Sequence, residues 1–443
     1  MLCAIASPPH LAGIMPVVTA SNYYHHWAYQ GGAFMQLLAQ AWSSVLAIDT
    51  LQRRIGGSAL PTLRDMKIPA AEYQLFELGN LNGLADYYFD WIAHPTYDEY
   101  WKQWAIEEDY SRIKVPGLHV AAWYDLFQDG SLRNYIGIKA FGGTEEARKG
   151  QRLVIIPGGH AGFGEKIADV DFGKESTLDT WALGLKWYDY LLKGQENEFS
   201  RQKPVKVFVM GKNKMREEDD WPLARAKMTS YFLHSAGGAN SAVGDGVLSR
   251  IEPRSEKADT FVYDPADPVP TNGGGTLGDT TRFPPGPIDQ RKIEERKDIL
   301  VYTTPAFEKD VEVTGKITLE VYLSSSAVDT DLTGKLIDVW PDGFAQNLTD
   351  NILRLRYRNG FEKAEFMKRG SVYKVQLDLW STSNVFLAGH KLRLEVSSSN
   401  FPRFNRNLNT AENPEKSKAF VKATNTIYHD RNRPSALKLP IIE

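Results

Sequence analysis

Residues 117–156 constrain the fold more than any other part of this 443-residue chain. Two short apolar runs, residues 117–123 and 152–156, flank a stretch of helical character at residues 130–140. A strand–helix–strand unit makes a right-handed crossover, which leaves the two strands parallel and brings their carboxyl ends to one edge of the sheet. The chain therefore contains an α/β domain, and ligands of such domains bind at that edge.

Two chemically useful residues follow these strands. Asp125 comes after the first strand, and His160 comes after the second, at the end of a Gly-Gly-His loop. An acid followed by a histidine is the order found in the catalytic triad of α/β-hydrolases, where a nucleophilic serine precedes both. An imidazole with an ordinary pKa of about 6.5 can accept and return a proton near neutrality. The plainer alternatives are a helix N-cap for Asp125 and a solvated turn for His160.

A nucleophile does not accompany this pair. The strand-to-helix motif Gly-x-Ser-x-Gly, which exposes the serine in such enzymes, occurs nowhere in the sequence. Ser131 lies on the Asp125 side and lacks the second glycine. Cys3 has no activating neighbour, and we expect it in the core. The sequence thus supplies an acid and a base without the third member of a triad.

The first residues read as the interior of a domain. Residues 1–6 are apolar without a basic region before them, which does not fit a signal peptide. They resemble part of a buried helix, and residues 11–19 read as a fully buried strand of the parallel sheet. Because neither element has a partner in the sequence before it, we expect that an N-terminal portion is missing.

Four segments follow from the change of pattern along the chain. Residues 1–21 and 112–224 are expected to form the α/β domain, with a helix at 178–192 and a strand at 205–210, and the helix carries Trp181, Leu185 and Leu192 on one face. Residues 22–111 read as a helical cap whose Trp and Tyr residues suit a core or, together, a cover over an apolar pocket. Residues 225–443 carry short alternating runs between turn residues, which indicates an antiparallel β-sandwich. Those runs are 229–233, 260–263, 317–323, 352–356, 371–377 and 391–396.

Composition excludes several classes of partner. The net charge of -3 gives no basic field for nucleic acid or an anionic membrane, and no apolar run approaches ~18 residues. A single cysteine allows no intrachain disulfide, which favours a cytoplasmic location. Asp329, Asp331 and Asp338 do not complete a calcium loop and read as turn and strand-end residues, so no metal or cofactor is expected. An exposed sheet edge would allow copies of the chain to associate as a homo-oligomer.

Several blocks of sequence resemble one family over essentially the whole chain. They include Trp123-Tyr124-Asp125 with Ser131-Leu132-Arg133, and the runs YDPADPVP at 263–270, SSSAVDTDL at 324–332, SNVFL at 383–387 and VSSSNFP at 396–402. In these blocks the chain resembles the cocaine-esterase-type (CocE/NonD) acyl hydrolases, relatives of the X-Pro dipeptidyl-peptidases. The resemblance implies an α/β-hydrolase domain interrupted by a helical cap and followed by a jelly-roll domain.

The resemblance also implies roles for individual residues. Asp125 becomes the acid and His160 the base of a Ser-His-Asp triad. Phe127 matches an aromatic residue of the acyl pocket, and Tyr24 and Trp27 fall near the cap contacts with substrate. Where relatives carry Trp-Ser before the histidine, Gly158 and Gly159 stand here, so we expect a roomier or more mobile pocket. The segment that carries the serine in the family would lie before Met1.

These observations predict a serine hydrolase that cleaves an ester, an amide or a short peptide through an acyl-enzyme. Without the serine, the chain alone is expected to be nearly inactive. Two alternatives remain open at this point: a non-catalytic protein that binds a carbohydrate or an apolar ligand, and a fragment that is complemented by a separately made N-terminal part.

Overall fold

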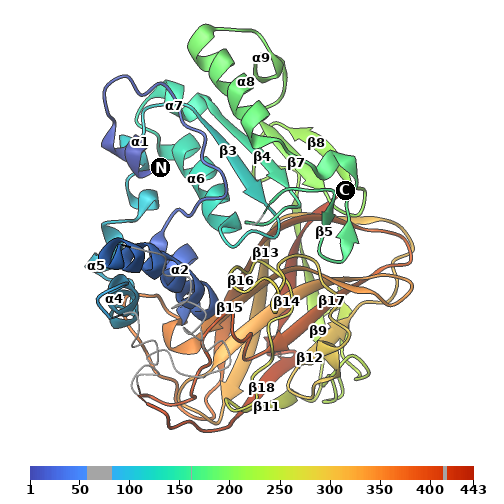
Figure 1. Cartoon of the computed structure of the whole chain (residues 1–443). Helices are drawn as coiled ribbons and strands as arrows, with labels where there is room; N and C mark the ends of the chain where they lie inside the picture. The colour runs from blue at the N-terminus through green and yellow to red at the C-terminus, as the bar shows by residue number, and fades with distance from the viewer. Residues whose placement is uncertain (57–81, 161, 413–416) are drawn as a thin grey trace.

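The computed structural model describes residues 1–56, 82–160, 162–412 and 417–443. Figure 1 shows a small α/β layer above a large β-structure, with the helical segment on one side between them. The described helices and strands follow one another as helical, α/β and β regions, whereas residues 57–81 of the predicted cap lie outside the described ranges.

The α/β layer contains the predicted strand–helix–strand unit. Strands β3 (Gly117–Ala122) and β4 (Gln151–Ile156) pair in parallel, and α6 (Gln128–Phe141) connects them with α7 (Glu145–Lys149). The sheet continues through β7 (Val205–Val209) to the antiparallel β8 (Lys214–Glu218). All six residues of β3 are buried, because helices and loops cover both faces of this apolar strand.

The opening segment differs from its prediction in one respect. Helix α1 (Leu2–Ala6) buries Ala4 and Ile5 but leaves Cys3 exposed, so the prediction of a core cysteine is wrong. Isolated parallel bridges join Ile14 to Gly117 and Val17 to Val120. This edge pairs on one side only among the described residues, so residues 11–19 are half-buried or exposed and do not form the fully buried strand expected.

The cap consists of short elements around one long helix. Its core is a cluster of buried aromatic residues that includes Tyr24, Tyr88 and Trp101. The elements are η1 (Tyr24–Ala28), β1 (Tyr29–Gln30), β2 (Ala33–Phe34), α2 (Gln36–Ile55), α4 (Tyr87–Ala93), α5 (Glu99–Lys102), η3 (Ile106–Glu108) and η4 (Tyr110–Arg112). Most single aromatic residues of the cap therefore serve packing, as the plainer interpretation of the sequence predicted.

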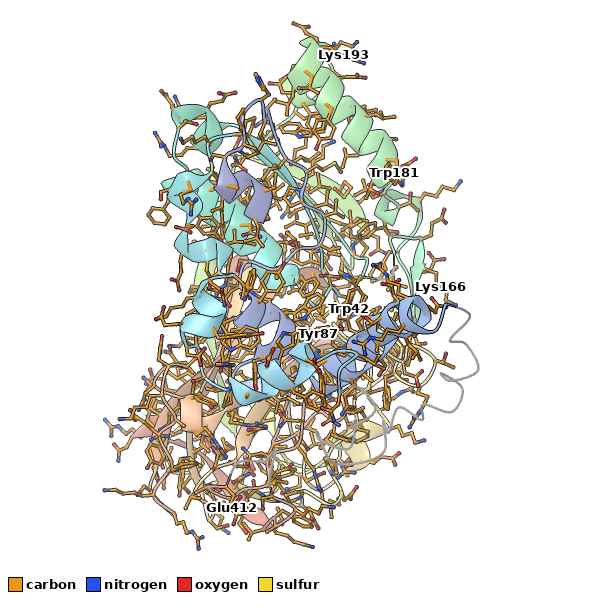
Figure 2. All side chains as sticks on the ribbon, turned by 60° about the vertical axis from the view of Figure 1, so that its left-hand side comes forward. Trp42, Tyr87, Lys166, Trp181, Lys193 and Glu412 are labelled. Atoms are coloured by element: carbon orange, nitrogen blue, oxygen red, sulfur yellow. The ribbon has the colours of Figure 1, made fainter. Side chains whose placement is uncertain are left out.

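Helix α8 (Thr180–Lys193) begins where Asp179 accepts a hydrogen bond from the Ala182 N–H at 3.0 Å. Its apolar stripe faces away from the sheet: Trp181, Leu185 and Leu192 are 86%, 69% and 62% exposed. Figure 2 shows Trp181 on this helix at the outside of the molecule. The helix packs through Trp187 instead, so the face that the spacing suggested is not the packed one.

The shorter elements of this part flank α8. They are β5 (Lys166–Ile167), β6 (Val170–Asp171), η5 (Lys174–Ser176) and α9 (Glu198–Arg201).

The C-terminal region is a large antiparallel β-structure, as predicted. The long strand β13 (Val311–Ser325) pairs with three neighbours, which are β16 (Tyr373–Phe386), β18 (Ala423–Asp430) and β20 (Ala436–Ile442). The remaining elements are β9 (Lys227–His234), β10 (Val247–Ser249), β11 (Asp259–Tyr263), η6 (Ile293–Glu295), β12 (Leu300–Thr303), β14 (Asp331–Val339), β15 (Ala345–Arg354), η7 (Leu355–Tyr357), β17 (Lys391–Ser397) and β19 (Arg433–Pro434). Alternating apolar side chains fill the space between the layers.

The three aspartates lie at or near the ends of β14, as predicted, and each also has a polar partner. Asp331 and Asp329 are buried and form ion pairs with Arg354 at 3.0 Å and Arg356 at 2.7 Å. Asp338, also buried, lies 2.8 Å from His390. These carboxylates stabilise the sandwich interior, where an unpaired charge would be costly.

Candidate active site

The loops after β3 and β4 hold Asp125 and His160 together. The Trp123 N–H donates to the carbonyl of Ile156 at 2.8 Å, and the Tyr124 N–H donates to that of Gly158 at 3.1 Å, so the two strand ends stay in register beyond the sheet. Asp125 Oδ2 then lies 3.0 Å from Nδ1 of His160. The structure thus brings together the two residues that the strand order predicted.

Asp125 is completely enclosed, with a side chain 0% exposed. Its second oxygen, Oδ1, accepts a hydrogen bond from the Phe127 N–H at 2.7 Å. Behind it lies Gly275, where an added Cβ would stand 3.1 Å from the Asp125 carbonyl oxygen. Both carboxylate oxygens are therefore engaged, which fixes the orientation that Asp125 presents to the histidine.

Among the described residues, His160 is bonded at one ring nitrogen only. Its side chain is 31% exposed, and Nε2 has no hydrogen-bond partner within the described ranges. Because Asp125 accepts at Nδ1, that nitrogen carries the proton of the neutral ring and leaves the lone pair on Nε2. An imidazole in this state can take a proton from a hydroxyl placed at Nε2.

Two aromatic rings extend from His160 into the cap. The Phe127 ring meets the His160 ring edge-to-face with centroids 5.1 Å apart, and the Trp27 ring stacks on Phe127 at 5.5 Å. Trp42 packs edge-on against Trp27 at 5.6 Å, and Figure 2 places Trp42 and Tyr87 in the cap. Beyond Trp27 lies a hollow of about 380 Å³ with a mainly aromatic lining. An apolar wall therefore runs from the Asp125–His160 pair into the cap.

Tyr24 occupies another place. Its side chain is 0% exposed, its hydroxyl donates to the Pro95 carbonyl at 2.8 Å, and its ring stacks on Tyr29. A ring enclosed in this way offers no surface to a ligand. Tyr24 therefore supports the cap core, and the predicted contact between Tyr24 and substrate is not compatible with this position.

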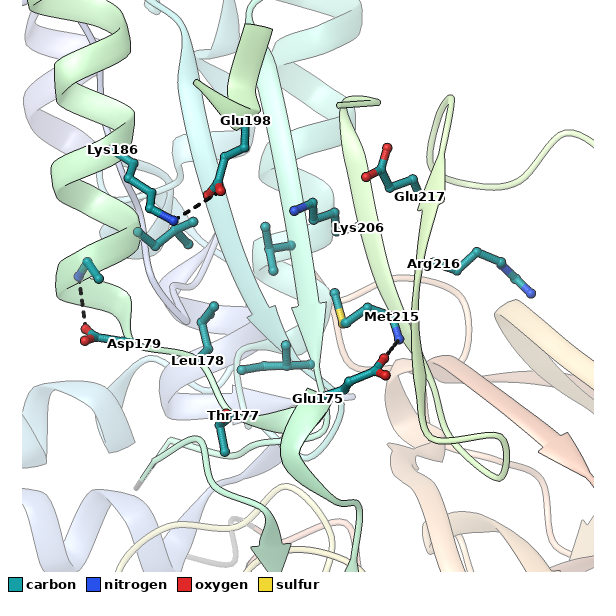
Figure 3. A pocket seen from close by; sticks show the side chains of 14 residues that line it. Glu175, Thr177, Leu178, Asp179, Lys186, Glu198, Lys206, Met215, Arg216 and Glu217 are labelled. Carbon is teal, nitrogen blue, oxygen red and sulfur yellow. Dashed lines mark hydrogen bonds and ion pairs between the residues drawn. The ribbon is translucent and has the colours of Figure 1, made fainter. Parts of the chain in front are cut away.

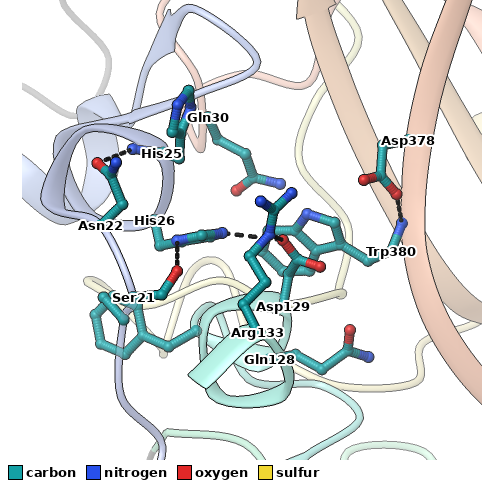
Figure 4. Close-up of polar contacts among 12 residues, drawn as sticks. Ser21, Asn22, His25, His26, Gln30, Gln128, Asp129, Arg133, Asp378 and Trp380 are labelled. Carbon is teal, nitrogen blue, oxygen red and sulfur yellow. Dashed lines mark hydrogen bonds and ion pairs between the residues drawn. The ribbon is translucent and has the colours of Figure 1, made fainter. Parts of the chain in front are cut away.

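A second serine–histidine–aspartate set lies beside the first, and sequence reasoning missed it. His26 Nε2 is 3.1 Å from Asp129 Oδ2, and its Nδ1 is 3.4 Å from Ser21 Oγ (Figure 4). The Ser21 hydroxyl donates to Glu107 at 2.9 Å, and Ser21 and His26 are 0% and 2% exposed. This serine is closed to a substrate, and the set joins the cap to α6.

Neighbouring charges lower the pKa values of the two carboxyl groups in this second set. Burial opposes ionisation of Asp129, but the hydrogen bond from His26 and the charge of Arg133, 2.5 Å away, outweigh it and hold the pKa of Asp129 well below its ordinary value. Burial also opposes ionisation of Glu107, whose pKa is lowered by the same two partners. Burial and the neighbouring His26 lower the pKa of His25 to about 3, so His25 is neutral near neutrality.

Two further groups considered from the sequence, Ser131 and Cys3, form no hydrogen bond with His160. Ser131 is buried, accepts from the Thr19 N–H at 3.0 Å and donates to the Thr19 carbonyl at 3.1 Å. Cys3 belongs to α1, apart from the catalytic loops. In the part of the chain that the structure describes, no hydroxyl or thiol forms a hydrogen bond with Nε2 of His160.

The two glycines before His160 give less room than expected. A Cβ at Gly158 would lie 2.4 Å from the Phe163 ring, and one at Gly159 would lie 3.3 Å from the Tyr124 carbonyl oxygen. The Gly-Gly sequence therefore permits a close approach of neighbouring groups to the loop. It does not open a space on this side of His160.

Two other hollows have polar side chains in their linings. One, of about 340 Å³, is lined in part by His26, Asp129 and Arg133 of the second set. The other, of about 390 Å³, lies between α8 and the sheet (Figure 3), where Lys186 pairs with Glu198 at 3.2 Å and Glu175 accepts from the Met215 N–H at 3.1 Å. Within the described ranges, no three His, Cys, Asp or Glu side chains are grouped to hold a metal ion. No described helix combines the length and apolar character needed to cross a bilayer.

Comparison with known proteins places this chain in a family. Residues 1–162 match the model of the X-Pro dipeptidyl-peptidase (S15 family), and residues 197–438 match that of the X-Pro dipeptidyl-peptidase C-terminal non-catalytic domain. The cocaine esterase of Rhodococcus sp. (strain MB1 Bresler) is 35% identical over 461 residues, which cover 99% of this chain and 78% of that protein.

Solved structures agree on the fold. An aminopeptidase from the marine sediment archaeon Thaumarchaeota archaeon superimposes with a TM-score of 0.81 at 24% identity, covering 100% of this chain and 74% of its own. An α-amino acid ester hydrolase gives a TM-score of 0.81 at 21% identity, covering 99% and 74%. The chain has the α/β-hydrolase fold with a C-terminal β-sandwich, and it belongs to the X-Pro dipeptidyl-peptidase (S15) family of serine hydrolases.

Proposed function

We propose that this chain contributes the acid and the base of an acyl hydrolase that cleaves an ester or an amide. The observation that carries this proposal is the pair itself. The enclosed Asp125 carboxylate lies 3.0 Å from Nδ1 of a half-exposed His160 whose Nε2 has no partner in the described ranges. A partly exposed histidine that is oriented by a buried acid and keeps one nitrogen unbonded is what general acid–base catalysis requires.

The chemistry follows from the two nitrogens of His160. Nε2 removes the proton from a serine hydroxyl as its oxygen attacks the carbonyl carbon of the substrate, and Asp125 stabilises the imidazolium that forms. The imidazolium then gives the proton to the leaving alcohol or amine as the acyl bond breaks. Water, deprotonated at the same Nε2, releases the acid product and restores the serine.

The serine of this mechanism is not among the 443 residues. Three observations support this part of the proposal: the sequence lacks Gly-x-Ser-x-Gly, Ser131 and Ser21 are buried and hydrogen-bonded elsewhere, and the sheet edge at Ile14 and Val17 pairs only with β3 among the described residues. A polypeptide that continues the parallel sheet from that edge would bring a nucleophile to the carboxyl ends of the strands.

Phe127 and Trp27 are the substrate contacts that the geometry favours. The Phe127 ring touches the His160 ring, and Trp27 continues the same apolar surface into the cap. A carbonyl carbon held near Nε2 would place its acyl or leaving group along these rings, which favours substrates with an apolar or aromatic group.

A serine-directed fluorophosphonate tests both parts of this proposal. We expect no labelled serine in the 443-residue chain. In a protein that combines this chain with a serine-bearing segment of the same family, we expect one labelled serine. Its labelling should fall in a His160→Ala variant and stay unchanged in His10→Ala, which alters an exposed histidine. Labelling of a serine in the chain itself would contradict the external nucleophile. Equal labelling with and without His160 would favour a non-catalytic ligand-binding protein.

A further inference from the structure

The segment 272–288 of the β-sandwich lies directly behind the catalytic acid. Gly275 packs against the Asp125 backbone, and Leu277 packs against the apolar cluster that contains Phe127. The base of the segment is closed by two backbone hydrogen bonds between Gly274 and Gly286, 2.8 and 2.9 Å long. A displacement of this segment would therefore alter the packing around Asp125.

Gln290 holds both ends of this segment with one side chain. Its amide nitrogen donates to the carbonyl oxygens of Asn272 at 3.1 Å and Ile288 at 2.7 Å. Its amide oxygen accepts from Nζ of Lys335 at 2.6 Å, and the side chain is fully buried. Because the lysine donates to one end of the amide, it determines which way the other end points.

Two buried glutamates stand next to Lys335, where β14 and β17 run side by side (Figure 1). Glu395 is the cross-strand partner of Lys335, and its Oε2 lies 3.3 Å from Nζ. Glu294, in η6, pairs through its Oε2 with Arg393 of β17. These contacts use one oxygen of each carboxyl group.

The other oxygens, Oε1 of Glu294 and Oε1 of Glu395, are buried and have no donor among the described residues. The two carboxyl groups are nevertheless close enough to hydrogen-bond with each other. Two carboxylates cannot donate, so both atoms would remain unsatisfied if both groups were ionised. A single proton between the groups satisfies both.

We propose that Glu294 and Glu395 share one proton, and that this proton keeps Lys335 on Gln290 and thereby holds segment 272–288 against Asp125. When the proton leaves, a second buried carboxylate lacks a donor, and the nearest ammonium group, Lys335, moves toward it. Gln290 then loses the donor that orients its amide, and the segment loosens. The effect on catalysis rests on the role proposed above for Asp125, whereas the effect on the segment does not.

The charges around Glu294 set the pH range. Burial, and then the charge of Glu395, raise the pKa of Glu294 to about 8, against the opposing charges of Arg393 and Lys335. Arg291 adds a cation on its own segment. An acid whose folded pKa is raised binds its proton more tightly in the folded state, so the stability it contributes is present at low pH and is lost as the pH rises through about 8.

Hydrogen exchange of segment 272–288, expressed as protection factors, tests the proposal at about pH 7 and about pH 9. The wild-type chain is expected to lose about tenfold or more of its protection between these values. Glu294→Gln places a permanent N–H donor beside Glu395, so this variant should keep its protection at both. Gln290→Met should lose protection at both, and Glu308→Gln, at an exposed position, should behave as wild type.

Infrared spectroscopy adds a readout that does not depend on the segment. A protonated-carboxyl band should disappear as the pH rises and be missing in Glu294→Gln. Unchanged protection in the wild-type chain, or an equal loss in Glu294→Gln, would overturn the proposal. Neither measurement uses hydrolysis, so its failure is distinguishable from failure of the proposed function.

Discussion

Two histidine–carboxylate pairs lie one helical turn apart, because Asp125 precedes α6 and Asp129 lies within it. In the first pair, His160 uses one nitrogen, and its side chain is 31% exposed. In the second, both nitrogens of His26 have partners, and its side chain is 2% exposed. The same residue types thus give an open pair, the proposed proton-transfer site, in one place and a closed pair that joins the cap to α6 in the other. The difference is that His160 keeps one ring nitrogen unbonded among the described residues and a side chain partly exposed.

The largest expected effect separates the pairs by activity. In a protein that supplies the serine, His160→Ala or Asp125→Asn should lower kcat/KM for a p-nitrophenyl ester about 10³- to 10⁴-fold. The loss follows because the base, or the acid that orients it, is removed. His10→Ala is the matched control and should retain activity. A comparable rate in His160→Ala would contradict the assignment of the base.

The free energy of unfolding should depend more on the second pair than on the first. Asp129→Ala removes a buried carboxylate shared by His26 and Arg133 and should lower the free energy of unfolding by about 3–5 kcal/mol. Asp125→Asn keeps the acceptor for the Phe127 N–H and should cost no more than about 1 kcal/mol. Urea unfolding of the two variants measures both values. Equal losses of unfolding free energy in the two variants would contradict a structural role confined to the second pair.

The loss of folding stability at low pH should depend on the second pair. Since the pKa of Asp129 is depressed in the folded state, its contribution to stability is present above its unfolded value of about 4 and is lost as the pH falls toward the folded value. Unfolding midpoints should therefore drop between about pH 5 and about pH 3, and the drop should be smaller in Asp129→Asn. A parallel drop in both proteins would assign the acid sensitivity to other carboxylates.

The smallest effect concerns the aromatic wall of the first pair. Phe127→Leu and Trp27→Leu keep an apolar side chain but remove a ring stack worth about 0.5–1.5 kcal/mol, so KM for an aryl ester should rise up to about tenfold. Tyr29→Leu, in the cap core, is the control and should change stability more than KM. No preference between aryl and alkyl esters in any variant would exclude this wall as a substrate contact.

The parts of the fold that the sequence predicted are those set by local pattern. Strands β3 and β4 are apolar and short, and a crossover helix separates them, so their ends and the positions of Asp125 and His160 followed from topology. The β-sandwich followed in the same way from alternation and turn residues. Such features depend on neighbours along the chain, which a single sequence displays.

The features that escaped prediction depend on packing between distant segments. Trp181 and Leu185 have helical spacing, yet nothing local tells which face of α8 meets the sheet. His26 meets Asp129 only because the cap packs on α6. The ion pairs of Asp329 and Asp331 left a usable signal: arginines at 354 and 356 have the same spacing of two, which suits two strands facing each other.

Hydrolysis of a short-chain p-nitrophenyl ester by the 443-residue chain, with His160→Ala measured beside it, tests the central claim most directly. The proposed function places the base in this chain and the nucleophile in a segment outside it. It therefore predicts equal rates for the two proteins at the level of uncatalysed ester hydrolysis in buffer. A faster rate in the wild-type chain that disappears in His160→Ala would contradict it, because a nucleophile would then act within these residues.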